Sequence, residues 1–205
     1  MKKPQHNGVS LLGAGGHAKV ILDILESCDL PVNGLYDDRL VGERFGYPIK
    51  GRLLETNGRT GYFLIALGDN AIRKKVAIKL ELQFISLSDR SAIVSPTVRL
   101  GKGTVIMPGT VVNAGTVIGE HAIINTSASV DHDCVIEDFV HIAPNSTLCG
   151  NVQVGEGTLF GAGAVAIPGV KIGKNCTVGA GAVVVNDVPA GATVVGNPAK
   201  IIKSL

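Results

Sequence analysis

The sequence predicts a small α/β domain followed by a long array of short β-strands, and three observations support this division. Apolar and amphipathic segments alternate over the first 88 residues of the 205-residue chain. A large aliphatic residue then recurs at every sixth position from Val94 to Val184, and the chain contains 27 glycines. Frequent glycine is typical of a backbone with many tight, regularly placed turns. We therefore expect an α/β domain over residues 1–88, a repetitive β domain over 89–190 and a C-terminal tail over 191–205.

The α/β domain begins with strand and helix signals in alternation. Four apolar runs are typical of strands: Val9–Leu12, Val32–Tyr36, 62–67 and 83–86. A helical stripe follows the first run and ends near Cys28, and Asp69 or Asn70 can cap a second helix. Ligands of parallel α/β units bind at the carboxyl ends of the strands, so we expect a ligand site there.

Glycines and acidic residues lie at those carboxyl ends. The run Gly13-x-Gly15-x-x-Ala18 formally matches the dinucleotide-binding fingerprint, with Asp37 and Asp38 about 20 residues further on. Such glycines let a backbone approach a phosphate at the start of a helix, and the carboxylates can accept hydrogen bonds from a ribose or a base. Because a full NAD domain has six strands and this one has about four, we favour a nucleotide-diphosphate sugar over NAD. The alternative is that the glycines only close a strand–helix turn.

The repeat in the second domain has two inward positions in every six residues. The large position is held by Val94, Leu100, Ile106, Val112, Ile118, Ile124, Val130, Ile136, Ile142, Leu148, Val154, Phe160, Ala166, Ile172, Val178 and Val184. Four residues after a large residue comes a small or β-branched one, as at Thr104 and Ala122. Because strand side chains alternate between faces, this spacing indicates one short strand and one corner per repeat. Cys134 and Cys176 hold the small position, so we assign them to the core.

Charge and composition exclude several classes of protein. With 19 Lys and Arg against 17 Asp and Glu, the chain has a formal net charge of +2 and no basic run typical of nucleic-acid binding. No apolar stretch approaches the ~18 residues of a membrane span, and the first residues do not have the pattern of a signal peptide. We therefore expect a soluble, cytoplasmic protein. The four cysteines form no CxxC pair and no zinc-type spacing, so neither disulfides nor a metal site is expected.

The six-residue repeat resembles that of the hexapeptide-repeat family over about residues 90–190. The resemblance implies a left-handed parallel β-helix with three repeats in each triangular coil, and about five coils. It also implies a homotrimer of parallel prisms. Apolar outward residues such as Val111, Val117, Val135 and Val165 need covering, which agrees with such an assembly.

Four motifs extend the resemblance to nearly the whole chain: 13–20 (GAGGHAKV), 35–38 (LYDD), 66–70 (ALGDN) and 130–134 (VDHDC). Together they resemble the bacterial sugar acyltransferases of the sialic acid O-acetyltransferase type. Within these, the chain is most similar to enzymes that N-acetylate 4-amino-4,6-dideoxy nucleotide-sugars in the bacillosamine and perosamine pathways. The resemblance implies acetyl-CoA as the donor and a UDP- or GDP-sugar as the acceptor. It implies that the first domain holds the nucleotide-sugar, through Gly15, Gly16, His17, Lys19, Asp37, Asp38 and Gly68.

The register of the repeat places two histidines on different parts of the prism. His132 falls in a corner, and His141 projects outward from a flat face, so the two cannot easily share a site within one subunit. They can meet where the corner of one prism contacts the face of the next. Ala114 and Gly150 stack directly above and below His132, and because both are small they leave room for a substrate.

Acetyl transfer to an amine requires a base, and a histidine beside a carboxylate suits that task. The resemblance implies that His132 is the base, that Asp133 supports it, and that His141 lies near the acetyl group. It further implies an oxyanion-binding amide at about Gly150. The remaining acetyl-CoA contacts that we expect are Asn125, Ala162, Gly179, Ala180 and Lys200, although Lys200 can equally be part of a charged tail.

Three alternatives remain open at this point. O-acetylation of sialic acid uses the same architecture, and the sequence does not reveal which acceptor atom attacks. A γ-type carbonic anhydrase needs three converging imidazoles, whereas His121, His132 and His141 are well separated along the chain. A non-catalytic hexapeptide scaffold would leave the glycine-rich turn and the corner histidine unexplained.

Overall fold

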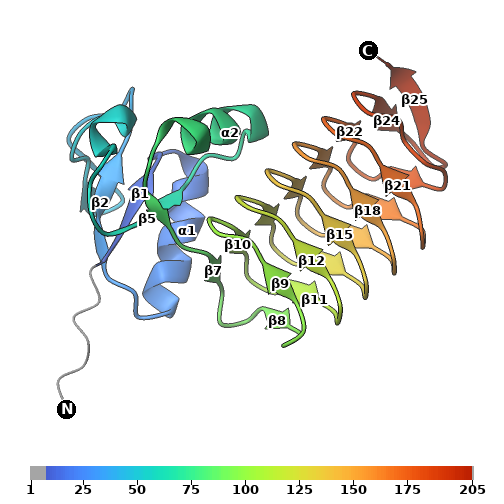
Figure 1. The fold of residues 1–205 in the computed structure, drawn as a ribbon, viewed down its shortest axis with the longest axis horizontal. Coiled ribbons are helices and arrows are strands. Elements are labelled where there is room, and N and C mark those ends of the chain that lie inside the picture. Colours follow the sequence, from blue (N-terminus) through green and yellow to red (C-terminus); the bar gives the residue numbers. More distant parts are fainter. Residues whose placement is uncertain (1–7, 205) are drawn as a thin grey trace.

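The computed structural model describes residues 8–204 as an α/β domain beside a stack of triangular β-coils (Figure 1). The α/β domain holds the first strands and both α-helices, and the coils extend from it to the carboxyl end. The coils are those of a left-handed parallel β-helix. The predicted fold class is therefore confirmed.

A four-stranded parallel sheet forms the centre of the α/β domain. Its order is β2 (Val32–Tyr36), β1 (Val9–Leu12), β5 (Tyr62–Ile65) and β6 (Gln83–Phe84). The first two predicted strands have the predicted bounds, and the last two end earlier than predicted. A short hairpin of β3 (Glu43–Arg44) and β4 (Tyr47–Pro48), which the sequence did not predict, lies between β2 and β5.

Helices cover both faces of this sheet. Helix α1 (Gly16–Ser27) buries Ile21 and Leu25 between the sheet and the first coils, where they share a core with Val105 and Ile123. The 3-10 helix η1 (Leu53–Thr56) and helix α2 (Asn70–Lys79) cover the other face. Asp69 caps α2, as predicted, because its side chain accepts the backbone N–H of Ile72 at 2.8 Å.

Three parallel sheets form the three faces of the β-helix. The first face contains β7 (Leu87–Ser88), β10 (Val105–Ile106), β13 (Ile123–Ile124), β16 (His141–Ile142), β19 (Leu159–Phe160), β22 (Thr177–Val178) and β24 (Thr193–Val195). The second face contains β8 (Ile93–Val94), β11 (Val111–Val112), β14 (Ser129–Val130), β17 (Thr147–Leu148), β20 (Val165–Ala166) and β23 (Val183–Val184). The third face contains β9 (Arg99–Leu100), β12 (Val117–Ile118), β15 (Val135–Ile136), β18 (Gln153–Val154) and β21 (Lys171–Ile172).

The expectation of about five coils was wrong, because the first face has seven parallel strands. The stack extends beyond residues 89 and 190 at both ends. Strand partners in neighbouring coils lie the same number of residues apart as far as Val178. The next partner, Val194, lies closer to Val178 in the sequence, so the last coil is shorter than the others. Strand β25 (Lys200–Lys203) then folds back antiparallel on β24 and ends the stack.

The inward positions are buried as predicted, except at the first strands of the stack. The small position is buried in every coil from Thr104 to Ala182, and Cys134 and Cys176 lie in the core. The large position is buried from Ile106 onward. Leu100 instead is 36% exposed, because its strand β9 is the first of the third face and has a neighbouring strand on one side only.

Hydroxyl groups at the small position connect neighbouring coils. Thr116 Oγ1 donates to the Asp131 carbonyl at 2.8 Å, and Thr158 Oγ1 donates to the Gly173 carbonyl at 2.8 Å. The same Thr158 oxygen accepts the Cys176 backbone N–H at 2.9 Å. A half-buried carbonyl and a buried N–H are thus satisfied by one side chain, which explains Thr at inward positions.

Each corner has three residues after the large inward position. The first of them must be small where coils stack closely, and the third adopts a positive φ. A Cβ at the first-position Gly101 would lie 2.4 Å from the carbonyl carbon of Gly119, so close stacking of coils requires glycine there. The third position adopts positive φ, as at Asp133 (57°) and Asn151 (61°). Asp and Asn tolerate this left-handed conformation better than most residues do.

We expect Thr158→Val to lower the free energy of unfolding by about 1–3 kcal/mol, because it leaves a buried N–H and a buried carbonyl without partners. Thr177→Val is the matched control, because Thr177 is exposed on the first face. Chemical denaturation of both variants measures the difference. Equal stabilities would show that the inward hydroxyl groups do not stabilise the stack.

Candidate functional site

His132 and Asp133 lie on the edge between the second and third faces, in the corner that follows β14. The structure brings the two side chains together, with Nδ1 of His132 2.8 Å from Oδ2 of Asp133. Asp131 Oδ1 accepts the His132 backbone N–H at 2.8 Å and the side-chain amide of Asn113 at 2.9 Å. The Asp133 carboxylate favours the proton on Nδ1, which leaves the Nε2 lone pair available to accept another proton.

Acidic neighbours also tune the basicity of His132. The hydrogen bond to Asp133 raises the pKa of His132 above 6.5, and the charge of Asp131 adds to this effect. The His132 side chain is 54% exposed, so the pair is open to a substrate from solvent. An accessible imidazole that a carboxylate orients is suited to general base catalysis.

Gly150 makes room for the imidazole of His132. A Cβ at Gly150 would lie 2.7 Å from both Cε1 and Nε2 of that ring. The sequence analysis expected the small residues around His132 to leave space for a substrate, but on the Gly150 side the His132 ring itself occupies that space. Ala114, on the other side, is exposed. Within residues 8–204 the Gly150 N–H donates to no protein acceptor, as an oxyanion-binding amide requires.

His141 lies on the first face, at the junction with the α/β domain. Its Nε2 is 2.9 Å from Nδ2 of Asn125. Burial, followed by the charge of Arg73, lowers the pKa of His141 to about 4, and the Gly68 backbone acts in the opposite direction. His141 is therefore neutral at physiological pH, in contrast to the more basic His132.

His17 in the first turn of α1 joins this cluster. Burial lowers the pKa of His17 to about 4, with smaller contributions from His141 and Arg73. Its Nε2 is buried and has no hydrogen-bond partner in the described part of the chain. The sequence analysis assigned His17 and Gly68 to the nucleotide-sugar and His141 to acetyl-CoA, whereas the structure places all three in one neighbourhood.

The glycines of the strand–helix turn serve two purposes. Gly13 has a φ of 114°, and a Cβ there would lie 2.7 Å from Leu67 Cδ2, so this glycine is structural. At Gly15 and Gly16 no described atom lies within 4 Å of a Cβ position, so their side of the turn is open. Helix α1 has no side-chain cap among residues 8–204, which leaves the N–H groups of its first turn beside this open surface. Lys19 is exposed in the same turn.

The two predicted acidic residues shape the loops at the carboxyl end of β2. Asp37 Oδ2 accepts the Ala14 N–H at 2.9 Å, and Oδ1 accepts the N–H groups of Arg39 and Leu40. Burial acts to raise the pKa of Asp37, but these backbone hydrogen bonds lower it overall. Asp38 Oδ1 accepts the Leu53 N–H at 3.0 Å. Both carboxylates thus have structural partners, and their contact with a nucleotide stays a prediction.

A cavity of about 250 Å³ separates the β5–α2 loop from the first face. Gly68 and Asn70 line one wall, and Leu159 and Thr177 line the other. Leu159 is the strand partner of His141, so the cavity lies beside the buried histidine cluster. It offers space for a ligand between the two domains.

The predicted acetyl-CoA residues divide between two edges of the prism. Asn125, Ala162 and Ala180 lie in three corners of the edge between the first and second faces, where Ala162 and Ala180 are exposed. Gly150 lies on the edge that carries His132. Gly179 is small for a structural reason, since a Cβ there would lie 2.7 Å from Val195 Cγ1. Lys200 is exposed at the start of β25.

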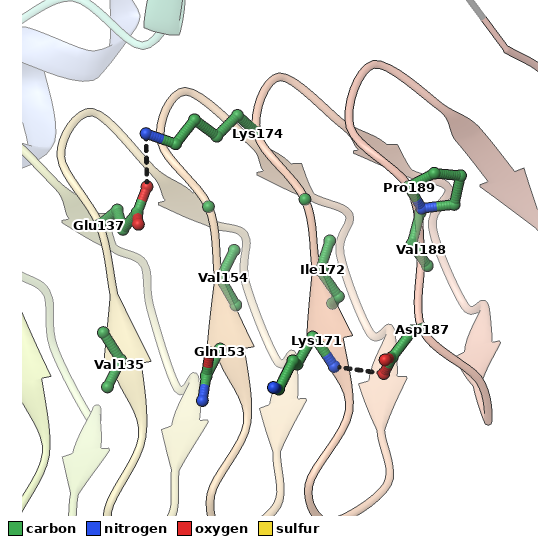
Figure 2. Close-up of a pocket in the computed structure, with 12 residues that line it drawn as sticks. Val135, Glu137, Gln153, Val154, Lys171, Ile172, Lys174, Asp187, Val188 and Pro189 are labelled. Atoms are coloured by element: carbon green, nitrogen blue, oxygen red, sulfur yellow. Dashed lines mark hydrogen bonds and ion pairs between the residues drawn. The ribbon is translucent and has the colours of Figure 1, made fainter.

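A second cavity, of about 520 Å³, follows the outer surface of the third face (Figure 2). Val135, Gln153 and Lys171 line it in successive coils, and Lys174 pairs with Glu137 across one side at 3.5 Å. Its lining, taken over the described residues, includes no histidine and none of the predicted site residues. We therefore do not place acyl-transfer chemistry there.

His121 has a structural position and does not join the other histidines. Its ring stacks on Phe139 at 5.4 Å and meets the edge of Phe84 at 4.7 Å. Burial, followed by the charges of Arg73 and Lys102, lowers its pKa to about 4. Among residues 8–204, no three His, Cys, Asp or Glu side chains lie close enough to share a metal ion. A carbonic anhydrase site built on these histidines does not fit this arrangement.

The sequence analysis missed one residue at the domain junction, Arg73. It is 1% exposed and donates hydrogen bonds to both domains. The sequence showed it only as one of three consecutive basic residues on a helix. Nothing in that local pattern distinguishes a buried arginine from its exposed neighbours.

Two family comparisons agree with this architecture. Residues 9–80 match the PglD N-terminal domain. Residues 133–166 and 151–186 match the bacterial transferase hexapeptide repeat. In the described part of the chain, no helix has the length and apolar character needed to cross a membrane.

Similar proteins cover nearly the whole chain. GDP-perosamine N-acetyltransferase of Escherichia coli O157:H7 is 30% identical, over 96% of this chain and 97% of its own. PerB from Caulobacter crescentus, solved in complex with CoA and GDP-perosamine, is 41% identical with a TM-score of 0.91, over 96% and 97% of the two chains. The acetyltransferase domain of PglB from Neisseria gonorrhoeae FA1090, in complex with acetyl coenzyme A, is 38% identical with a TM-score of 0.92, over 96% and 100%.

Gly150→Ala tests whether the ring position of His132 matters. The added methyl group would displace an exposed ring rather than the backbone, so we expect the melting temperature to change little. A displacement of about 1 Å can reduce catalysis by ~10²-fold, and we expect a loss of that size in kcat/KM. Ala114→Ser on the opposite side of His132 is the control. Full activity of Gly150→Ala would show that the observed ring position is not required.

Proposed function

The chain belongs to the bacterial hexapeptide transferases that carry a PglD N-terminal domain, and from this membership we propose its reaction. It transfers the acetyl group of acetyl-CoA to the 4-amino group of a nucleotide-linked 4-amino-4,6-dideoxysugar, a UDP- or GDP-sugar. The similar proteins are N-acetyltransferases or have CoA, acetyl-CoA or GDP-perosamine bound, which supports an amine acceptor over the hydroxyl of sialic acid. We propose that this reaction takes place in the cytoplasm, as the sequence analysis expected.

The observation that carries this proposal is the His132–Asp133 pair. The pair lies on an exposed edge, and the His132 ring packs against Gly150, whose N–H donates to no acceptor in the described part of the chain. A base and an oxyanion donor in neighbouring corners of one edge are the two groups that acyl transfer to an amine requires.

The proposed chemistry proceeds through one tetrahedral intermediate. The amine nitrogen attacks the thioester carbonyl carbon while His132 Nε2 takes a proton from it. Asp133 stabilises the resulting imidazolium, and the Gly150 N–H donates to the oxyanion. The carbon–sulfur bond then breaks, and the proton passes from His132 to the CoA thiolate.

The two substrates bind from different sides in this proposal. The nucleotide-sugar lies over the open turn of Gly15 and Gly16 and extends along the cavity beside Gly68. Acetyl-CoA lies along the edge of Asn125, Ala162 and Ala180, with its thioester near His141.

We further propose a homotrimer that packs through the second face. The outward residues of this face carry no charge: Ile93, Val111, Ser129, Thr147, Val165 and Val183. The third face instead exposes Arg99 and Lys171. Packing second faces around a threefold axis brings the His132 edge of one subunit toward the Asn125 edge of its neighbour. The resulting site takes residues from two subunits.

Release of CoA from acetyl-CoA in the presence of GDP- and UDP-linked 4-amino-4,6-dideoxysugars tests the reaction. We expect turnover with one of them, and a ~10²–10⁴-fold loss of kcat/KM in His132→Ala. Because His132 must be neutral to accept a proton, kcat/KM should fall as the pH decreases through its raised pKa. Asp133→Asn removes the main cause of that shift, so the fall should move to lower pH.

Two outcomes would contradict this reaction. One is the absence of acetyl transfer to any of these amino sugars while a sialic acid hydroxyl is acetylated. The other is a pH-independent ratio near one between wild-type and His132→Ala rates, which would show that His132 is not the base.

Subunit mixing tests the shared site. We expect His132→Ala and His141→Ala trimers to be impaired separately and to regain activity when hybrid trimers form, because some interfaces then combine two intact edges. Mixing differently tagged His132→Ala subunits with one another is the control. Purified hybrids without recovery would place both histidines in the same subunit's site or in none.

A further inference from the structure

A third cavity, of about 430 Å³, lies on one face of the sheet in the α/β domain. Ser10 on β1 and Phe63 on β5 line its floor, and Gly34 on β2 is the other strand partner of Ser10. The loop of residues 58–60 forms a wall and leads into the amino end of β5. The residues that we assign to the nucleotide-sugar instead follow the carboxyl ends of strands. The cavity therefore shares no residue with that site.

Two cationic side chains, Lys50 and Arg59, border this cavity, and its lining over the described residues includes no carboxylate. Both side chains are exposed, and neither forms an ion pair within residues 8–204. An anion in the cavity would therefore meet two positive charges that no lining acidic group neutralises.

Contacts on the protein side orient the guanidinium of Arg59. Its Nε donates to the Glu55 carbonyl at 2.9 Å, and Nη1 donates to the Tyr36 hydroxyl at 3.4 Å. The group also lies over the Tyr36 ring, 5.6 Å from its centroid. A guanidinium has five N–H donors, and within the described chain these contacts leave both donors of Nη2 free. The free edge can bind two oxygens of one anionic group.

Gly34 allows the Lys50 side chain to lie across the sheet. A Cβ at Gly34 would lie 2.8 Å from Cε of Lys50 and 3.1 Å from its Cγ, so a larger residue would displace this side chain. The Lys50 backbone N–H donates to the Leu35 carbonyl at 2.8 Å, which fixes the start of the side chain beside β2. The aliphatic part thus packs on bare backbone while the ammonium group borders the cavity.

Ser10 places a hydroxyl group on the floor of the cavity. It is 6% exposed, and no hydrogen bond joins its hydroxyl to another group of residues 8–204. Its neighbours on the same face of the sheet, Leu12, Phe63 and Ile65, are apolar and buried. Buried hydroxyl groups normally have a partner, because leaving one unpaired is unfavourable. A polar group at this position therefore indicates a ligand atom that accepts its hydrogen bond.

We propose that this cavity binds the phosphate group of a small molecule, at a site separate from both substrates of the proposed reaction. Arg59 and Lys50 neutralise the charge of the phosphate, and Ser10 donates to one of its oxygens. Two cations suit a dianion better than a single carboxylate. The volume lies in the range of ~300–1,000 Å³ that is typical of small-molecule sites. It leaves room for an organic part, which can contact Tyr36 and Phe63.

Calorimetric titration of the full-length protein with glucose 1-phosphate tests the proposal, with glucose as the uncharged control. We expect saturable binding of one glucose 1-phosphate per chain and no binding of glucose. Inorganic phosphate separates the two possible sources of the group. Equal affinity for phosphate and the sugar phosphate supports a site for the free ion, and weaker binding of phosphate supports a site that also contacts the organic part. No saturable binding of either compound would overturn the proposal.

Charge variants locate the binding. We expect Arg59→Gln and Lys50→Gln each to lower the affinity for glucose 1-phosphate about 10–100-fold, as the loss of a charge-assisted hydrogen bond does. Their melting temperatures should stay unchanged, because both side chains are exposed. Arg99→Gln is the matched control, since it removes one exposed cation from the third face of the β-helix, and it should change the affinity less than twofold. Equal losses in all three variants would show only general attraction by net charge and would overturn the site.

Lys19→Gln distinguishes this cavity from the open turn of Gly15 and Gly16, which meets a phosphate group in the proposed function. Affinity that is lost in Lys19→Gln and kept in Arg59→Gln would place the phosphate at the turn and overturn the proposal. Because binding is measured without acetyl transfer, the result does not depend on the proposed reaction.

Ser10→Ala tests the hydroxyl on the floor. We expect an affinity about 3–10-fold lower with no loss of thermal stability, because the hydroxyl has no partner within the described chain. A less stable Ser10→Ala protein with unchanged affinity would show that the hydroxyl is structural, and would overturn its assignment to the ligand.

Discussion

The architecture of this protein depends on a constant coil length. Val105 pairs with Ile123 and Ile123 pairs with His141, and the same interval recurs up the first face as far as Thr177. A residue type repeated at that interval therefore forms a column along the prism. The inward hydroxyl groups reinforce this length, because Thr116 reaches the carbonyl of Asp131 in the next coil and no other register aligns the two groups. Once the register is set, the place of every corner and every outward side chain follows from its number alone.

The junction between the domains depends on a buried charge, the guanidinium of Arg73. Removing a cation from water costs several kcal/mol, and the hydrogen bonds of Arg73 within the described chain go to neutral oxygens rather than to a carboxylate. Burial accordingly lowers the pKa of Arg73 to about 10, with Asp69 acting in the opposite direction. Four carbonyls and one amide oxygen replace the lost water. These five acceptors surround Arg73 only when the β5–α2 loop and the coils are in their observed positions. The buried guanidinium therefore favours this one docked arrangement of the two domains over others.

The sequence predicted the repeat well because its signal is local and periodic. Coil registers, buried cysteines, the His132–Asp133 corner and the cap of α2 all follow from spacing over short stretches of chain. The number of coils was underestimated because the terminal strands break the pattern: Ser88 occupies a large position, and the last coil is shorter than the others. The His17, Gly68 and His141 cluster was not predicted as one neighbourhood, and Arg73 was missed. Their proximity depends on how two domains dock, and no short-range pattern records that.

The contrast between the two histidines shows how environment assigns roles to identical side chains. His132 is exposed between two carboxylates, which raise its pKa, whereas burial and then the charge of Arg73 lower the pKa of His141 and keep it neutral. Environments that push the pKa values of like groups apart are a common way to separate a base from a neutral hydrogen-bonding group. Here the separation has a structural origin, since an edge of the prism projects into solvent and the first face is covered by the α/β domain. The α/β domain thus creates the environment, shielded from solvent, in which the second histidine keeps its neutral form.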